Sequence, residues 1–239
     1  MKTALVTGAT KGIGLAVAKM LLSKGYYVIA TFSHDEVAAN NARLNFQQIS
    51  ENFEIIKSSH AVTLQRQVIV ERITQLGHID CLICNAGTTL RKSLPDITDE
   101  DWNDVMNINV NSNVFLIRDL FSFFTHNARI VFIGSLMGIY PHGTSLAYGV
   151  SKTAVHALAP NLVKCFEGTN VTVNAIAPGF VDTEWQKNKD PQIRQNICNK
   201  TALGRFATVE EIANAVEFCV ENSFVNGSVI EVSGGYCYK

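Results

Sequence analysis

Residues 7 to 14 read Thr7-Gly8-Ala9-Thr10-Lys11-Gly12-Ile13-Gly14 and join a short apolar run to a segment with helical spacing. Glycines in such a turn let the backbone approach a phosphate group closely, although three glycines can also serve the turn alone. The helix that follows would present free N–H groups and the positive end of its dipole to the same anion. Because this turn stands in the first strand–helix unit of the chain, we predict that it binds a nucleotide.

Short apolar runs alternate with longer segments of helical spacing through the rest of the chain. Runs of strand length occur at 4–7, 27–32, 53–56, 81–84, 130–133, 171–176 and 229–232. Helical spacing occurs at 14–23, 63–75, 99–124, 147–165 and 209–221. Thr98 with Asp101, and Thr208 with Glu211, are typical of capping boxes at helix starts. The alternation predicts an α/β fold, a Rossmann-like, doubly wound parallel sheet of about seven strands with helices on both faces.

We expect a single domain over residues 1–239, because no internal repeat, low-complexity tract or linker divides the chain. One long segment, 182–206, carries scattered charges and Trp185 without a clear period. A loop of that length in a compact domain is often functional, so we predict a substrate lid there.

Composition describes an ordinary globular protein, with 47% hydrophobic and 17% charged residues and a net charge of −1. Because the chain has no excess of basic residues, neither nucleic acid nor a membrane surface is a predicted partner. The first apolar run follows Lys2 directly, which leaves no room for a secretory signal, so we expect a cytoplasmic protein with reduced cysteines. Cys81 and Cys84 form a CxxC, but their offset places them on opposite faces of a strand, so we predict a structural role and no metal site.

Tyr148 and Lys152 stand four residues apart in a segment of helical spacing, which places both on one helix face. A cation beside a phenol favours phenolate, so Lys152 and an oxidised nicotinamide would lower the pKa of Tyr148. Tyr148 could then exchange a proton with an alcohol or carbonyl oxygen. Taken alone, the pair could equally be ordinary packing on an amphipathic helix.

Several motifs occur together along the chain. They are the spacing GxxxGxG at 8–14, Asn85-Ala86-Gly87, Asn109, Ser135, Tyr148-Gly149-Val150-Ser151-Lys152 and Pro178-Gly179. Their order and spacing resemble those of the short-chain dehydrogenase/reductase family. The resemblance implies an oxidoreductase that uses a nicotinamide cofactor, with Asn109, Ser135, Tyr148 and Lys152 as catalytic residues. In such enzymes Ser135 would hydrogen-bond the reacting oxygen, Lys152 would hold the nicotinamide ribose, and Asn109 would help to hold a water in a proton relay.

The end of the second apolar run bears on the choice between NAD and NADP. An NAD enzyme needs a carboxylate there for the ribose hydroxyls, whereas Phe32 is followed by Ser33 and His34. Lys11 matches a position where NADP-using family members often carry a basic residue, so we predict NADP(H). NAD(H) stays open, because a small shift of register would bring in Asp35.

The resemblance implies a cofactor site that draws on many short segments. Its residues are Gly8, Thr10, Lys11, Gly12, Ile13, Gly14, Ser33, His34, Asn85, Ala86, Gly87, Tyr148, Lys152, Pro178, Gly179, Val181 and Thr183.

Within the family, residues 99–103, 204–206 and 234–236 most resemble the 3-oxoacyl-acyl-carrier-protein reductases. That similarity implies reduction of a 3-oxoacyl thioester, a homotetramer and an acyl carrier protein as partner, although only Arg129 is clearly basic where the carrier would dock. A sugar, polyol or other ketone is the alternative substrate, and an NADP-sensing protein without turnover is the third hypothesis. Leu136, Met137, Tyr140, Pro141 and Trp185 are candidates for an apolar substrate wall.

Overall fold

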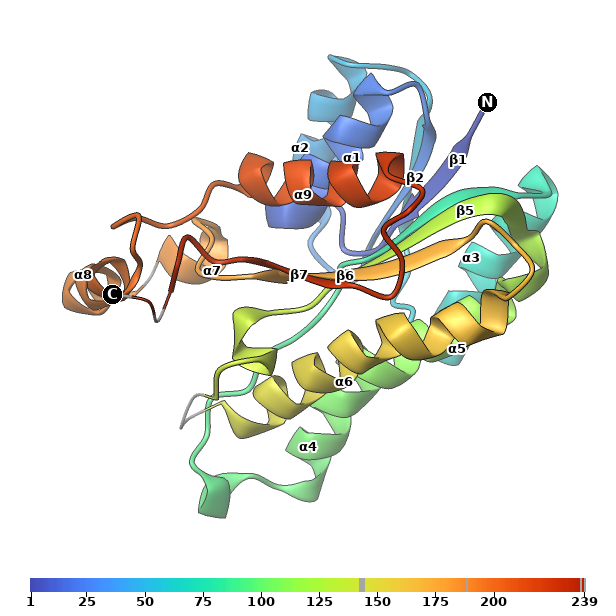
Figure 1. Cartoon of the computed structure of the whole chain (residues 1–239). Helices are drawn as coiled ribbons and strands as arrows, with labels where there is room; N and C mark the ends of the chain where they lie inside the picture. Colours follow the sequence, from blue (N-terminus) through green and yellow to red (C-terminus); the bar gives the residue numbers. More distant parts are fainter. Residues whose placement is uncertain (142–144, 188, 237, 239) are drawn as a thin grey trace.

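A single parallel sheet forms the centre of the fold (Figure 1). The computed structural model describes residues 1–141, 145–187, 189–236 and 238. The strands are β1 (Thr3–Val6), β2 (Tyr27–Phe32), β3 (Phe53–Lys57), β4 (Ile79–Cys84), β5 (Phe124–Ile133), β6 (Thr172–Pro178) and β7 (Val229–Val232). Seven strands lie in the order β3-β2-β1-β4-β5-β6-β7, which confirms the predicted sheet. The order reverses between β1 and β4, the position at which doubly wound sheets bind ligands.

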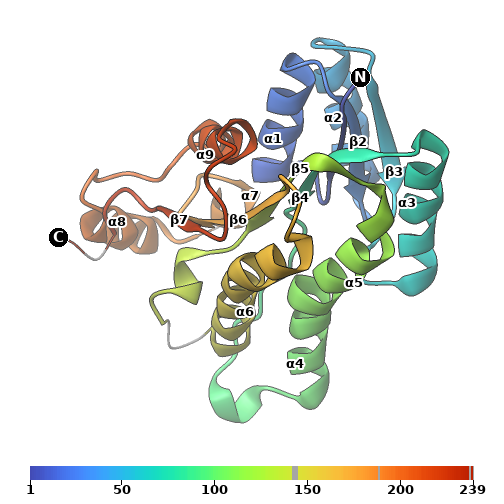
Figure 2. The ribbon, with the colours of Figure 1, turned by 45° about the vertical axis from the view of Figure 1, so that its right-hand side comes forward.

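Helices cover both faces of the sheet, as the alternation predicts (Figure 2). They are α1 (Gly12–Ser23), α2 (Glu36–Gln47), α3 (Thr63–Leu76), α4 (Asp99–Met106), α5 (Ser112–Asp119), α6 (Leu146–Val163), α7 (Glu184–Lys187), α8 (Pro191–Lys200) and α9 (Val209–Glu221). A π-helical turn, Asn107–Asn111, joins α4 to α5. Both predicted capping boxes, at Thr98 and Thr208, are present.

Two hydrophobic cores hold these layers together, one on each face of the sheet. Side chains of α1, α2 and α9 pack on the first face, and those of α3, α5 and α6 on the second. Strand residues alternate between the two cores because successive side chains point to opposite faces. Cys81 and Cys84 follow this rule, since Cys81 joins the first core and Cys84 the second. Burial raises the pKa of the Cys81 thiol to about 12, as expected of a structural cysteine.

Helix α2 was not predicted, because its sequence is rich in asparagine and shows little apolar periodicity. Only Ala39, Ala42 and Phe46 are buried, on one narrow stripe. Asp35 starts the helix by accepting a hydrogen bond from the backbone N–H of Ala38 at 2.9 Å. The helix therefore depends on its cap and on three contacts with the core.

The predicted helix over 99–124 is wrong at its end. The helix stops at Asp119, one 3-10 turn follows, and Phe124 already begins β5. Leu120 is buried in the second core and Phe123 packs against it, so the apolar pattern continues past the end of the helix. Pro160 lies inside α6, which continues to Val163.

The segment 182–206 holds two helices, α7 and α8, which lie beside β7 (Figure 1). Helix α8 buries only Ile197, so its apolar stripe is too thin to read as a period. Asp190 caps α8 by accepting a hydrogen bond from the Gln192 N–H at 2.7 Å. In the described part of the chain, no helix combines the length and apolar character needed to cross a membrane.

Candidate active site

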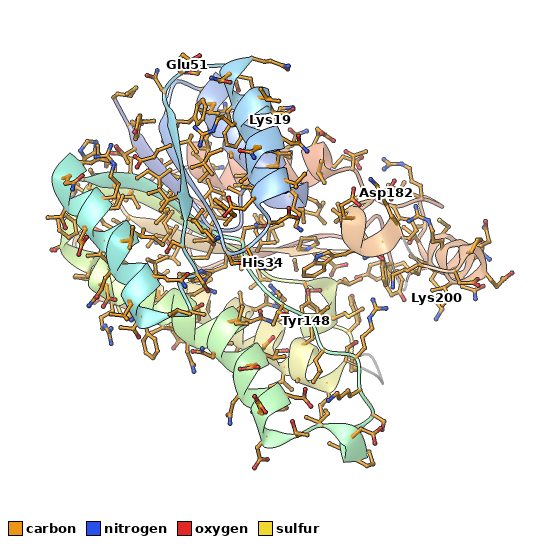
Figure 3. All side chains as sticks on the ribbon, turned by 180° about the vertical axis from the view of Figure 1, so that it is seen from behind. Lys19, His34, Glu51, Tyr148, Asp182 and Lys200 are labelled. Carbon is orange, nitrogen blue, oxygen red and sulfur yellow. The ribbon has the colours of Figure 1, made fainter. Side chains whose placement is uncertain are left out.

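A cleft of about 1000 Å³ opens at the carboxyl ends of the strands, around the reversal between β1 and β4. Its walls come from the loops that follow β1, β2, β4, β5 and β6, together with the start of α6 and the α7–α8 segment. Figure 3 labels three residues that line it: His34 after β2, Tyr148 on α6 and Lys200 at the end of α8. Residues far apart in the sequence thus share one ligand-sized space.

The glycine turn after β1 is packed so closely that side chains do not fit. A Cβ on Gly14 would lie 2.3 Å from the carbonyl oxygen of Gly8. The side chain of Asn85 bridges this turn to β4, because its Nδ2 donates to the carbonyls of Thr7 and Gly8, both at 2.9 Å. Helix α1 begins at Gly12 without a side-chain cap, so its first N–H groups are available to an anion. These features fit the pyrophosphate of a dinucleotide.

Charged and polar groups surround the next part of the cleft, where the loop after β2 faces the glycine turn. Lys11 Nζ lies 3.0 Å from Asp35 Oδ2, and Ser33 Oγ lies 2.7 Å from His34 Nδ1. The hydrogen bond from Ala38 N–H, followed by that from Lys11, lowers the pKa of Asp35. Asp35 is also engaged as the cap of α2 and as the partner of Lys11. Lys11 is the group here that could bind a phosphate on the adenosine ribose.

Tyr148, Lys152 and Ser135 meet at the centre of the cleft. The side chains of Ser135 and Tyr148 lie close together, and Lys152 Nζ lies 5.7 Å from the centre of the Tyr148 ring. Lys152 donates a hydrogen bond of 2.8 Å to the carbonyl of Ile133. Burial lowers the pKa of Lys152 to about 8, so the ammonium is readily deprotonated above that pH.

The protein's own groups raise the pKa of Tyr148, whereas the predicted lowering counted Lys152 together with an oxidised nicotinamide. Burial is the largest cause of the rise, and the Ser135 side chain offsets only part of it. Lys152 directs its Nζ at the carbonyl of Ile133, so burial of the phenol outweighs the nearby cation. Tyr148 is therefore protonated at neutral pH and is arranged to donate a proton.

His156, one helical turn beyond Lys152 on α6, contacts the turn that carries Ser135. Its Nε2 accepts a hydrogen bond of 3.2 Å from the backbone N–H of Ser135. The ring fills the space beside two glycines, since a Cβ on Gly134 would lie 2.2 Å from Nε2 and one on Gly138 2.8 Å from Cε1. Burial, followed by the charge of Lys152, lowers the pKa of His156 to about 4. The ring is neutral at pH 7, so Nε2 stays an acceptor.

A His156→Leu variant should therefore lower kcat about tenfold, because a buried N–H left without an acceptor costs about 1–3 kcal/mol at the turn that carries Ser135. His156→Gln keeps an acceptor on a side chain of similar length and should recover most of the rate. Steady-state oxidation of reduced cofactor measures both variants. Equal rates for His156→Leu and the unaltered enzyme would show that the ring does not position Ser135.

Asn109 lies behind the catalytic group, in the π-helical turn, and is almost fully buried. Its Oδ1 accepts from the N–H of Thr88 at 2.7 Å, and its Nδ2 donates to the carbonyl of Thr88 and to Ser151 Oγ, both at 2.9 Å. The backbone carbonyl of Asn109 accepts from Asn113 Nδ2 at 2.7 Å. Asn109 thus ties the loop after β4 to α6.

Comparison with known proteins agrees with these features. Residues 2–194 match the family described as short chain dehydrogenase. The chain belongs to that family. This short-chain dehydrogenase is 30% identical to the 3-oxoacyl-[acyl-carrier-protein] reductase FabG of Escherichia coli K12, over 98% of this chain and 96% of the other.

Solved structures show the same fold at lower identity. A short-chain dehydrogenase/reductase from Serratia marcescens is 26% identical, with a TM-score of 0.93 over 99% of this chain and 98% of the other. A short chain dehydrogenase from Burkholderia cenocepacia, solved in complex with NADP, is 26% identical, with a TM-score of 0.91 over 98% of this chain and 97% of the other. The dehydrogenase is thus an oxidoreductase that uses a nicotinamide cofactor.

The structure brings most of the predicted site residues of the dehydrogenase into the cleft. Those that line it are Gly8, Thr10, Lys11, Gly12, Ile13, Ser33, His34, Asn85, Ala86, Gly87, Ser135, Tyr148, Lys152, Pro178, Gly179, Val181 and Thr183. Gly14 and Asn109 do not line it; Gly14 packs under the glycine turn and Asn109 behind Gly87. In the described residues, no three His, Cys, Asp or Glu side chains gather where they could hold a metal ion.

The remaining wall of the cleft contains both apolar and polar residues. The candidates for an apolar wall all line it: Leu136, Met137, Tyr140, Pro141 and Trp185. Arg91, Gln186 and Lys200 line it too and were not predicted. No local sequence pattern marks Gln186 or Lys200. Arg91 follows the Asn85-Ala86-Gly87 motif closely, and that position could have indicated a role for it.

Proposed function

We propose that this short-chain dehydrogenase uses NADPH to reduce a ketone to a secondary alcohol. The observation that carries the proposal is that Ser135, Tyr148 and Lys152 lie together in the same cleft as the glycine turn. Bound NADPH would supply the hydride to the carbonyl carbon. A binding-only protein has no use for a phenol arranged to give up its proton there.

Each side chain then has a defined role. Ser135 Oγ donates a hydrogen bond to the carbonyl oxygen and orients it, and Tyr148 transfers its phenolic proton to that oxygen as negative charge develops. Lys152 holds the nicotinamide ribose hydroxyls and stabilises the phenolate that remains. Asn109 helps to hold a water through which the phenolate regains its proton.

Preference for NADPH over NADH should depend on Lys11 and Asp35. Lys11→Met should raise the KM for NADPH about tenfold and leave that for NADH nearly unchanged, since a charge-assisted hydrogen bond contributes about 1.5–3 kcal/mol. Asp35→Asn still caps α2 but removes a carboxylate that competes for Lys11, so it should lower the KM for NADPH. Initial rates with both cofactors test the pair. Parallel changes for NADPH and NADH would contradict a phosphate site here.

The first substrate to test is a 3-oxoacyl thioester, because several similar proteins are named 3-oxoacyl-[acyl-carrier-protein] reductases. The single basic residue expected to dock a carrier protein is otherwise engaged. The Arg129 side chain donates to the carbonyls of Val220, Asn127, Ala128 and Asn170. This favours a second candidate, reduction of a free ketone, sugar or polyol precursor.

The deciding experiment follows NADPH absorbance with acetoacetyl thioester and with a panel of free ketones. Oxidation of NADPH with any of them supports the proposal, and the relative kcat/KM values choose between the two substrate classes. NADPH binding without oxidation of any compound would favour the NADP-sensing protein instead. A lid at 182–206, a homotetramer, an acyl carrier partner and a cytoplasmic location stay predictions.

A further inference from the structure

The loop after β4 and the α7–α8 segment, which form part of the cleft wall, carry three basic side chains without acidic partners in the described part of the chain. Arg91 follows the Asn85-Ala86-Gly87 motif, Lys189 precedes α8, and Lys200 ends it. Arg91 and Lys200 line the same cleft as Tyr148. In Figure 3, Lys200 lies on the α8 side of Tyr148, away from His34.

None of the three has an ion-pair partner among the residues that the structure describes. Three carboxylates in or next to these segments are already paired: Asp101 with Lys92, Asp182 with Arg194, and Glu184, which lines the cleft, with Lys187. Asp190, which follows Lys189, caps α8 and does not line the cleft. Arg91 and Lys200 therefore present positive charge to the cleft without an acidic partner among the described residues that line it.

The charge of Arg91 also acts on Lys189, although Lys189 does not line the cleft. Partial burial, followed by the charge of Arg91, lowers the pKa of Lys189. Like charges near each other destabilise the protein, and an anion placed between them reverses the sign of that interaction. Side chains arranged in this way are typical of a site for a carboxylate or phosphate.

Gln186 adds a neutral polar group to the same part of the cleft wall. Its side-chain oxygen is buried and has no hydrogen-bond partner among the described residues. An unpaired buried acceptor costs about 1–3 kcal/mol, so a ligand that brings a donor here gains affinity. The cofactor phosphates fit elsewhere, at the glycine turn and Lys11, so the cations and Gln186 are left for the substrate.

We propose that the ketone reduced by this enzyme carries its own carboxylate or phosphate group, which Arg91, Lys189 and Lys200 bind while the carbonyl faces Tyr148. The inference rests on the proposed function and specifies its substrate class as small oxo acids or phosphorylated ketones. Neutral ketones and uncharged esters lack the group that these cations recognise.

The test compares substrates that differ in charge and little else. The pairs are 3-oxobutanoate with its methyl ester, 4-oxopentanoate with its methyl ester, and dihydroxyacetone phosphate with dihydroxyacetone, each with NADPH. In at least one pair the anion should have a kcat/KM at least tenfold higher than the neutral compound. The triple variant Arg91→Ser, Lys189→Ser, Lys200→Ser should reduce that ratio at least tenfold, chiefly through the KM of the anion.

A matched control separates local binding from the change in net charge. Replacement of Lys2, Lys57 and Lys164 by Ser also removes three positive charges, all from side chains outside the cleft lining, and should keep the ratio. A ratio near one in every pair, or a ratio that the cleft variant does not change, overturns the inference. Failure of the proposed function looks different, since NADPH would then bind without oxidation by any anion, ester or thioester.

Docking of an acidic carrier protein on the same cations is the competing result. It would appear as a raised KM for an acetoacetyl carrier-protein thioester in the cleft variant, with the small anions no better than their neutral partners. That outcome would overturn the small-anion inference and leave carbonyl reduction intact.

Discussion

Replacement of Tyr148 by Phe is expected to lower kcat about 10³-fold, within the range of about 10²–10⁴ for loss of a general acid. The variant keeps the ring, which lies beside Ser135, and removes only the phenolic oxygen. NADPH should bind with nearly unchanged affinity, because the glycine turn and Lys11 do not contact that oxygen. Steady-state rates and a fluorescence titration with NADPH measure the two effects separately.

Tyr27→Phe is the matched control for this prediction. It removes a phenolic oxygen that pairs with Glu54 and Arg72 on β3 and α3, outside the cleft. Its activity should equal that of the unaltered enzyme. If Tyr148→Phe retained more than a tenth of the activity, proton donation by Tyr148 would be wrong, and another donor at the cleft would have to replace it.

The sheet could be predicted almost completely from the sequence, and the physical reason is burial. Strands such as β1 and β6 are buried along their whole length, so apart from Asn174 and their first threonines their sequences are apolar runs with clear ends. Helix α2 and helix α8 bury few side chains, and each is started by an aspartate cap that no apolar pattern announces. Helices that are stabilised by a cap and a few buried side chains show less apolar periodicity than elements that bury many side chains in the core.

The residues of the candidate site also differ in how far the sequence predicts them. Residues that follow strand ends, such as Ser33, Asn85 and Ser135, meet because all parallel strands end at one edge of the sheet. His156 and Arg91 depend on contacts between distant segments, so their positions could not be read from local spacing. Spacing on a helix places Lys152 near Tyr148 but says nothing of burial or of where the ammonium points, so the sequence did not predict that burial raises the pKa of Tyr148.

Gly14→Ala should have the second large effect, on cofactor binding and stability together. In most helices this change stabilises the fold by about 0.8–1.0 kcal/mol, since alanine is the better helix former. Here the added Cβ would lie 2.3 Å from the Gly8 carbonyl and 2.5 Å from Asn85 Nδ2. The backbone of the glycine turn must move to make room, and the bridge from Asn85 to β1 moves with it.

We therefore expect Gly14→Ala to weaken NADPH binding about 10²-fold, or about 2.7 kcal/mol, and to lower Tm despite the better helix propensity. Calorimetric titration with NADPH and thermal unfolding measure the two changes. Gly25→Ala provides the comparison, because Gly25 has a φ of +79° but no atom within 4 Å of an added Cβ. That variant should lose only about 1–2 kcal/mol of stability, because of its left-handed backbone conformation, and should bind NADPH with normal affinity. Normal binding by Gly14→Ala as well would mean that close packing under the glycine turn does not shape the phosphate site.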